Sequence, residues 1–188
     1  SSSYAPAVGG GQFHVRLAGD NLLGYRVEVR KFFQDGAQDP QFGVAGLLSV
    51  VTDRMDQLFV HTARDGSLTI LAASNNNSAD PLFSVGVMVV IRLQANGQPA
   101  PGFGEQGVVR LYQKNGPVVD VLHDTALGTV IVTYDSPDRL RGVALHALDA
   151  QGKPLTSFGD QGVARIGLSL LAWKTGGIDE VGRVLMVT

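Results

Sequence analysis

One short motif, F-G-x-x-G, occurs three times in this chain at a nearly constant spacing. The copies occupy residues 42–46, 103–107 and 158–162, so they are 61 and then 55 residues apart. Each copy also begins six residues after another glycine; these glycines are Gly36, Gly97 and Gly152. A fixed period of this kind is the signature of repeat proteins, in which each copy is one structural unit packed on its neighbours. The motif therefore predicts a fold built from repeated units.

Segments rich in β-branched and apolar residues separate the motifs, and no segment has a helical period. Further glycines, Gly66 and Gly128, fall between pairs of these segments at the place of a hairpin turn. Each unit therefore holds four strands in about 60 residues. The predicted strands are residues 47–51, 58–62, 68–73 and 85–93 in one unit, and residues 108–112, 118–123, 129–134 and 142–148 in the next.

Four antiparallel strands repeated in this way are typical of a β-propeller blade. The sequence predicts one all-β domain over residues 1–188, with a partial unit at 1–46, full units at 47–107 and 108–162, and a partial unit at 163–188. We expect the motif glycines to adopt positive φ and the motif phenylalanines to be buried between units. The structural motif residues are Phe42, Gly43, Gly46, Phe103, Gly104, Gly107, Phe158, Gly159 and Gly162.

The sequence around the motifs resembles the bacterial delta-60 repeat. The resemblance is carried by residues 95–109 (A-N-G-Q-P-A-P-G-F-G-E-Q-G-V-V), 150–164 (A-Q-G-K-P-L-T-S-F-G-D-Q-G-V-A) and 34–43, and it extends over residues 11–188. The first copy also has Asp39, where that family commonly has an aspartate, whereas the later copies depart there. The resemblance implies a propeller-like fold in a large exported or surface protein of bacteria. No family-wide catalytic residue comes with it.

Composition narrows the classes of partner. The net charge is 15 − 17 = −2 and no long basic run occurs, which argues against binding of nucleic acid or an anionic membrane. No apolar stretch reaches the roughly 18 residues that a membrane span needs. The chain has no cysteine, so disulfides and a thiol nucleophile are excluded.

Two histidines occupy equivalent places in successive units. His61 and His123 each lie five residues before a hairpin glycine, and Asp120 and Asp124 flank His123. Repeated imidazoles at the same height of adjacent blades are suited to binding a divalent metal, with carboxylates adding ligands or orienting the rings. The alternative interpretation is that both histidines lie at strand ends and are hydrogen-bonded or solvated. Both interpretations remain open from the sequence.

An insertion distinguishes the first full unit, which has 31 residues between Gly66 and Gly97, against 24 between the equivalent glycines of the next unit. Extra length in a loop on a rigid scaffold is often where binding residues occur. The oxygen-rich side chains of this loop suit Ca²⁺, and a solvated loop without an ion is the alternative. The residues concerned are Asn75, Asn76, Asn77 and Asp80.

These observations favour a binding or assembly module of an exported bacterial protein, periplasmic, extracellular or on the cell surface, that meets a protein or glycan partner. No linear catalytic motif is present and no cofactor is required, apart from the divalent ion considered above. The alternative is a metal-dependent propeller hydrolase or lactonase with His61, His123 and Asp120 near its site. A stoichiometric metal in protein purified without chelator would favour the enzyme.

The two ends of the chain fall within repeats. Gly11 matches a hairpin glycine, so residues 12–17 and 25–33 are predicted as the third and fourth strands of a unit. Residues 163–166, 170–174 and 183–188 are predicted as the first three strands of another. End strands without a cap would pair with another chain. We therefore expect self-association through these strands, most simply as a two-fold dimer.

Overall fold

The computed structural model of the protein describes residues 1–20, 22–74, 86–113, 117–124, 128–135, 142–167, 174–178 and 184–187. Within these ranges every regular element is a β-strand, and the predicted all-β fold of four-stranded antiparallel repeats is confirmed. The same ranges contain no helix with the length and hydropathy needed to cross a membrane. A propeller-like arrangement is compatible with this fold.

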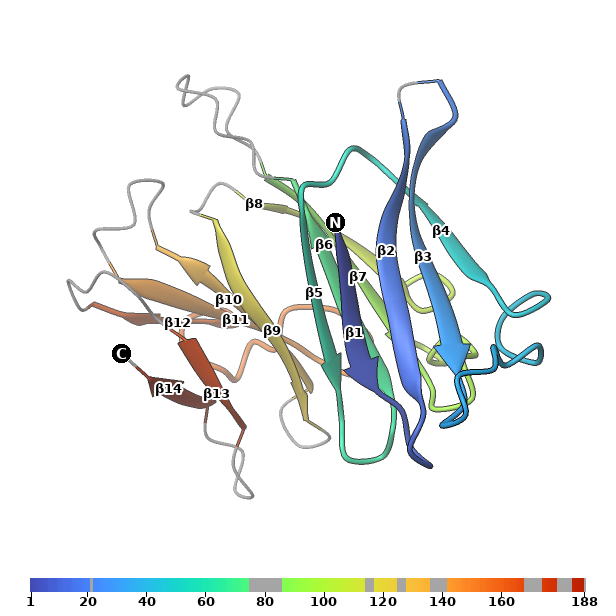
Figure 1. Cartoon of the computed structure of the whole chain (residues 1–188). Helices are drawn as coiled ribbons and strands as arrows, with labels where there is room; N and C mark the ends of the chain where they lie inside the picture. Colours follow the sequence, from blue (N-terminus) through green and yellow to red (C-terminus); the bar gives the residue numbers. More distant parts are fainter. Residues whose placement is uncertain are drawn as a thin grey trace. The chain divides into compact units, whose positions relative to one another are not determined.

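Each four-stranded sheet consists of consecutive strands in chain order (Figure 1). The first sheet contains β1 (Ser2–Pro6), β2 (Gln12–Asp20), β3 (Gly24–Phe32) and β4 (Leu48–Thr52). The second sheet contains β5 (Gln57–Thr62), β6 (Leu68–Ala73), β7 (Gly86–Leu93) and β8 (Val108–Gln113). The third sheet contains β9 (Val118–Asp124), β10 (Gly128–Tyr134), β11 (Val143–Leu148) and β12 (Val163–Ile166), and a separate pair is formed by β13 (Lys174–Ile178) and β14 (Val184–Val187).

The chain divides into two compact units. The first unit contains the first sheet and also the second sheet, as far as Leu111 in β8. The second unit contains the third sheet and the β13–β14 pair. In the first unit the two sheets share one apolar core, in which Val27 and Val29 of the first sheet are buried with Ile70 and Ile91 of the second. Strands β1 and β5 are edge strands of the first and second sheets, and they lie close together (Figure 1).

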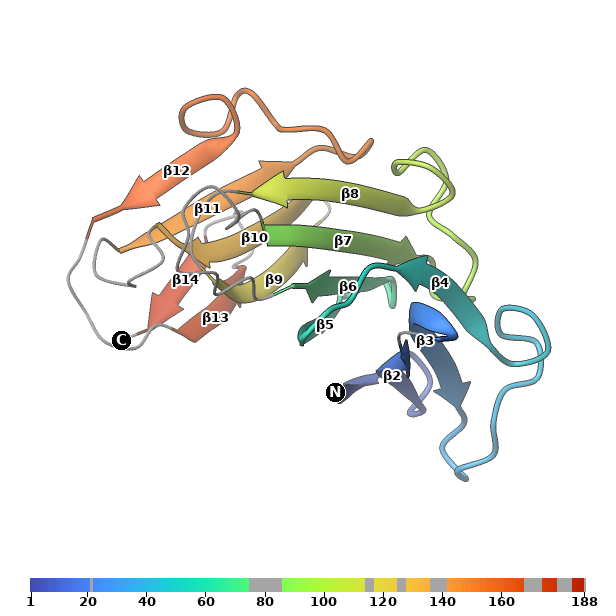
Figure 2. The same ribbon diagram turned by 90° about the horizontal axis from the view of Figure 1, so that it is seen from above.

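The third sheet, whose strands run in the order β9, β10, β11, β12 (Figure 2), has its own core. Leu122, Val132 and Leu145 are buried there, and the motif residue Phe158 packs against them while remaining only partly buried.

The last three residues of the motif and the residue after it form a tight hairpin turn that leads into the last strand of each four-stranded sheet. In the second sheet, Glu105 N–H donates to the oxygen of Val108 at 2.9 Å and Val108 N–H donates back at 3.0 Å. The two central residues, Gln106 and Gly107, have φ of 50° and 79°, which defines a type I′ turn. All six motif glycines have positive φ, so the prediction made for them is confirmed; they are Gly43, Gly46, Gly104, Gly107, Gly159 and Gly162.

Phe42, the phenylalanine of the first motif, packs between the two sheets of the first unit. It is fully buried, and its ring lies 5.7 Å from that of Phe13. A Cβ built on Gly97, in the turn after β7, would lie 2.2 Å from the Phe42 ring, so this glycine makes room for the ring. Phe103 is also buried, whereas the expected burial of Phe158 is only partial.

The N-terminal end of the first sheet differs from the prediction. Residues 12–17 are not an end strand, because β1 pairs with β2 from Ser2↔Arg16 to Pro6↔Gln12. The first sheet is thus completed by the chain's own N-terminal segment, and the expectation that another chain supplies this strand is wrong. At the other end, the predicted strand at 170–174 lies outside the described residues except for Lys174, which begins β13.

Candidate functional site

The structure places the two predicted metal-binding histidines in different units of the chain. His61 is half-buried on β5 in the first unit, and His123 is buried on β9 in the second unit. The Nδ1 atom of His123 lies 3.3 Å from the hydroxyl of Thr129. Asp120 is an odd number of residues from His123 on the same strand, so the two side chains lie on opposite faces. The Asp120 carboxylate instead accepts a hydrogen bond from the Val121 N–H at 2.8 Å.

The remaining predicted ligands are described only in part. Asp124 is the last residue of β9, but its side chain is not among the parts that the structure describes. Asn75, Asn76, Asn77 and Asp80 lie wholly outside the described residues. Among the residues that the structure does describe, no group of three or more histidine, cysteine, aspartate or glutamate side chains is placed to hold a metal ion. The metal and Ca²⁺ hypotheses therefore stay predictions.

His146 is a half-buried titratable group that the sequence did not single out. It lies on β11, and its Nε2 atom is 3.1 Å from the hydroxyl of Thr133 on the adjacent strand. Burial lowers the pKa of His146 to about 4, with a further lowering by Arg165 and an opposing effect of Asp135. This imidazole is neutral at physiological pH and is part of the packing of the third sheet.

A cluster of charged side chains lies on one face of the first sheet. The sequence R-V-E-V-R on β3 alternates, so Arg26, Glu28 and Arg30 share a face, and Val27 and Val29 point into the core. We call this face the charged face. Besides these three residues of β3 it includes Tyr4 on β1, His14 and Arg16 on β2 and Val51 on β4, which are paired with them across the sheet.

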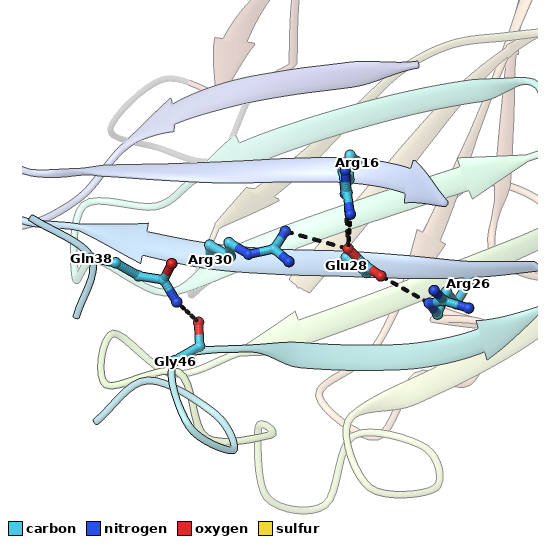
Figure 3. A network of polar contacts seen from close by, with 6 residues as sticks. All are labelled: Arg16, Arg26, Glu28, Arg30, Gln38 and Gly46. Carbon is cyan, nitrogen blue, oxygen red and sulfur yellow. Dashed lines mark hydrogen bonds and ion pairs between the residues drawn. The ribbon is translucent and has the colours of Figure 1, made fainter. Parts of the chain in front are cut away.

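The register of the sheet brings a third arginine to Glu28. Arg16 on β2 is directly opposite Glu28 on β3, and all three arginines point toward the carboxylate (Figure 3). One oxygen, Oε2, accepts from Arg16 at 2.7 and 2.8 Å and contacts Arg30 at 3.3 Å; the other, Oε1, accepts from Arg26 at 2.8 Å. The same figure shows a bond that closes the adjacent loop, from Gln38 Nε2 to the Gly46 oxygen at 2.9 Å.

The cluster is buried at its centre and open at its rim. The Glu28 side chain is 4% exposed, whereas those of Arg16, Arg26 and Arg30 are 45%, 35% and 25% exposed. The hydrogen bond from Arg26 is the largest cause that lowers the pKa of Glu28 to about 2. The hydrogen bond and charge of Arg16 and the charge of Arg30 lower the pKa further, whereas burial of the carboxylate raises it. Glu28 is therefore ionised at neutral pH, and the four groups together carry a charge of 3 − 1 = +2.

An aromatic pair continues the charged face across the sheet. Tyr4 on β1 is opposite His14 on β2, which is opposite Arg30 on β3. The Tyr4 and His14 rings are stacked with centroids 4.7 Å apart, and Tyr4 is 63% exposed. Burial, together with the charges of Arg16 and Arg30, lowers the pKa of His14. The charged face thus presents an open aromatic ring beside a positively charged row.

The equivalent face of the second sheet is apolar. Aligning Gly36 with Gly97 places Arg26, Glu28 and Arg30 at the positions of Val87, Val89 and Ile91. These three residues belong to the core that the second sheet shares with the first, and Val89 and Ile91 are fully buried. Charge at these positions is therefore not a requirement of the repeat but a property of the first copy.

Chemically, the charged face is suited to bind an anion. Each guanidinium has five N–H donors, and the contacts with Glu28 use one or two of them per arginine. Guanidinium groups bind carboxylates and other oxyanions in a planar, two-bonded geometry. Pinning by Glu28 orders the three side chains in advance, which lowers the entropy lost when a ligand binds.

The charged face was not identified from the sequence, although a signal was present. Residues 26–30 alternate charge with valine, while the equivalent residues 87–91 are uninterruptedly apolar. Comparison of the two copies position by position would have singled out the first.

Comparison of the chain with protein-family models, with curated proteins and with solved structures finds no match.

Proposed function

We propose that this chain is a binding or assembly module of an exported or surface protein of bacteria, in which delta-60-like repeats form a propeller-like scaffold. The scaffold has no catalytic role in this proposal, and the partner is a protein or a glycan. The localisation and the bacterial origin rest on the resemblance of the three motif regions to the delta-60 repeat.

The charged face is the observation that carries the proposal. Arg26 and Arg30 occupy positions that the second copy fills with the core residues Val87 and Ile91, and the partly exposed Arg16 and the exposed Tyr4 share their face. A scaffold that needed only solubility would be served by scattered charges of both signs. Concentrating arginine and an aromatic ring on one face is instead typical of recognition surfaces.

The proposal is tested with the purified chain on a panel of immobilised acidic and neutral glycans and acidic and basic polypeptides. We expect retention on at least one class of molecule, and loss of that retention in the double variant Arg26→Ser/Arg30→Ser. The Arg54→Ser variant is the matched control, because Arg54 is exposed in the loop before β5, outside the charged face. Retention on no member of the panel, or equal retention of the double variant, would overturn the proposal.

A further inference from the structure

We propose that the charged face binds an acidic polysaccharide, with its carboxylates on Arg16, Arg26 and Arg30 and one sugar ring against Tyr4. This inference rests on the proposed binding function and names the chemical class of its partner.

The three arginines come from different points of the sheet and converge on Glu28. Arg26 and Arg30 are four residues apart on β3, so about 13 Å of strand separates their Cα atoms, and Arg16 is on the neighbouring strand, opposite the midpoint between them. Their guanidinium groups meet at the Glu28 carboxylate and form one positively charged cluster that is partly exposed at its rim. Carboxylates repeated along a flexible chain can contact this cluster one after another, and each contact adds to the effective concentration for the next.

The aromatic ring lies at the end of a row across the sheet. Tyr4, His14 and Arg30 are directly opposite one another on β1, β2 and β3, so two strand spacings, about 10 Å, separate Tyr4 from Arg30. Stacking on His14 fixes the orientation of the Tyr4 ring and leaves it exposed. An exposed ring offers an apolar surface with a hydroxyl at its tip, which suits the C–H face and the hydroxyls of a sugar.

The composition of the face favours a glycan over a folded acidic protein. A protein interface of ordinary size buries about 800 Å² on each side and has an apolar centre from which charges are depleted. Here the centre is Glu28 with its three arginines, and the exposed apolar groups, Tyr4 and Val51, lie toward the edges. A flexible polyanion needs no apolar centre, because its affinity comes from successive ionic contacts.

The probe for this inference is polygalacturonate, a polysaccharide with one carboxylate per sugar, and its binding to the full chain is followed by calorimetry. We expect binding at low ionic strength that weakens roughly tenfold or more as salt rises to about 0.5 M, since exposed charges are screened within a few ångströms at that concentration. Dextran, which has no charge, should not bind. No binding of polygalacturonate would overturn the inference.

Two variants test the assigned residues separately. Tyr4→Ala removes the ring without touching the Glu28 cluster, and we expect it to weaken binding about fivefold to tenfold. Arg26→Ser removes one of the three cations and should weaken binding by a similar factor. The Arg54→Ser control should bind as the original chain does. Binding unchanged by Tyr4→Ala and by Arg26→Ser would overturn the assignment of the site.

Polyglutamate separates this inference from the more general proposal. We expect it to bind more weakly than polygalacturonate, and without sensitivity to Tyr4→Ala, because it has carboxylates but no sugar ring. Equal affinity for polyglutamate would overturn the glycan inference while leaving a binding function for the charged face. Loss of every interaction in the panel described above would remove that function as well, so the two failures are distinguishable.

Discussion

The first and second sheets are copies of one repeat, yet they differ on one face. Their turns are the same to within a few degrees: Gly36 and Gly97 both have φ of 85°, and the two motif turns both have positive φ at their central residues. The face that contains Arg26, Glu28 and Arg30 in the first sheet contains Val87, Val89 and Ile91 in the second, where it is buried against the first sheet. The glycine motif thus specifies the fold of a copy, and the alternating residues of its third strand specify what that copy packs against.

This difference also revises the expectation about the N-terminal end. In the first sheet β1 pairs along β2, so β2 is an inner strand rather than an edge strand. The charged face of the same sheet is polar where the equivalent face of the second sheet is apolar.

The strongest test of the comparison is to place the charge of the first sheet in the second. Val89→Glu puts a carboxylate at the position equivalent to Glu28 but inside the apolar core, where no arginine matches Arg16, Arg26 or Arg30. We expect a loss of about 5 kcal/mol or more at neutral pH, enough to unfold the first unit, because an unpaired charge is buried.

The matched control is Val51→Glu, the same substitution on the charged face. Val51 is exposed and lies opposite Arg26, so the new carboxylate meets a cation in water. Its effect on the free energy of unfolding, measured in denaturant, should lie within about 1 kcal/mol. Similar losses for the two variants would mean that the two faces are not different environments.

The next largest effect is expected at the motif phenylalanines. Phe42→Ala and Phe103→Ala each remove a fully buried ring and should cost about 3–5 kcal/mol. Phe158 is only partly buried in the third sheet, so Phe158→Ala should cost less, about 1–2 kcal/mol. Chemical denaturation of the three variants provides the measurement. A loss below about 1 kcal/mol for Phe103→Ala would contradict a packing role for the motif.

A third comparison uses the two equivalent turn glycines. Gly36 and Gly97 have the same φ, but a Cβ at Gly36 meets nothing within 4 Å, whereas a Cβ at Gly97 lies 2.2 Å from the Phe42 ring. Gly36→Ala should therefore cost only the backbone strain, about 1–2 kcal/mol. Gly97→Ala should cost about 2 kcal/mol more, as an overpacked core does. Equal thermal stabilities of the two variants would show that Phe42 moves aside without cost.

Much of the fold was predictable because its signals are local. Glycine adopts positive φ more readily than any other residue, so its spacing indicated the turns, and apolar β-branched runs such as that at Leu68–Ala73 indicated the strands. Strand β1 was missed because Ser2–Pro6 has no β-branched residue; the strand forms because β2 offers its unpaired backbone groups.

The candidate site was harder to predict because it depends on register. Arg16 and Glu28 are twelve residues apart, and only the pairing of β2 with β3 places them opposite one another. The same reasoning applies to Asp120 and His123, whose role as metal ligands stays a prediction. They are close in sequence, but an odd separation on one strand puts them on opposite faces.

The last expected effect is a dependence of stability on acid pH that arises in the first sheet. Its three arginines hold the pKa of Glu28 at about 2 in the folded chain, below the ordinary value of 4.5. Because the folded-state pKa is the lower one, the stabilisation is fully present above pH 4.5 and is lost as the pH falls toward 2. Its size is on the order of 2 kcal/mol, since solvent around the partly exposed arginines screens the pairs.

Glu28→Gln should therefore be less stable than the original chain at pH 6, and the gap in the free energy of unfolding should narrow steadily between pH 4.5 and pH 2. Val89→Gln, at the equivalent position of the second sheet, removes no carboxylate, so its difference from the original chain should not change with pH over that range. A gap for Glu28→Gln that is constant from pH 6 to pH 2 would mean that the arginines stabilise the charged face without depending on the ionised form of Glu28.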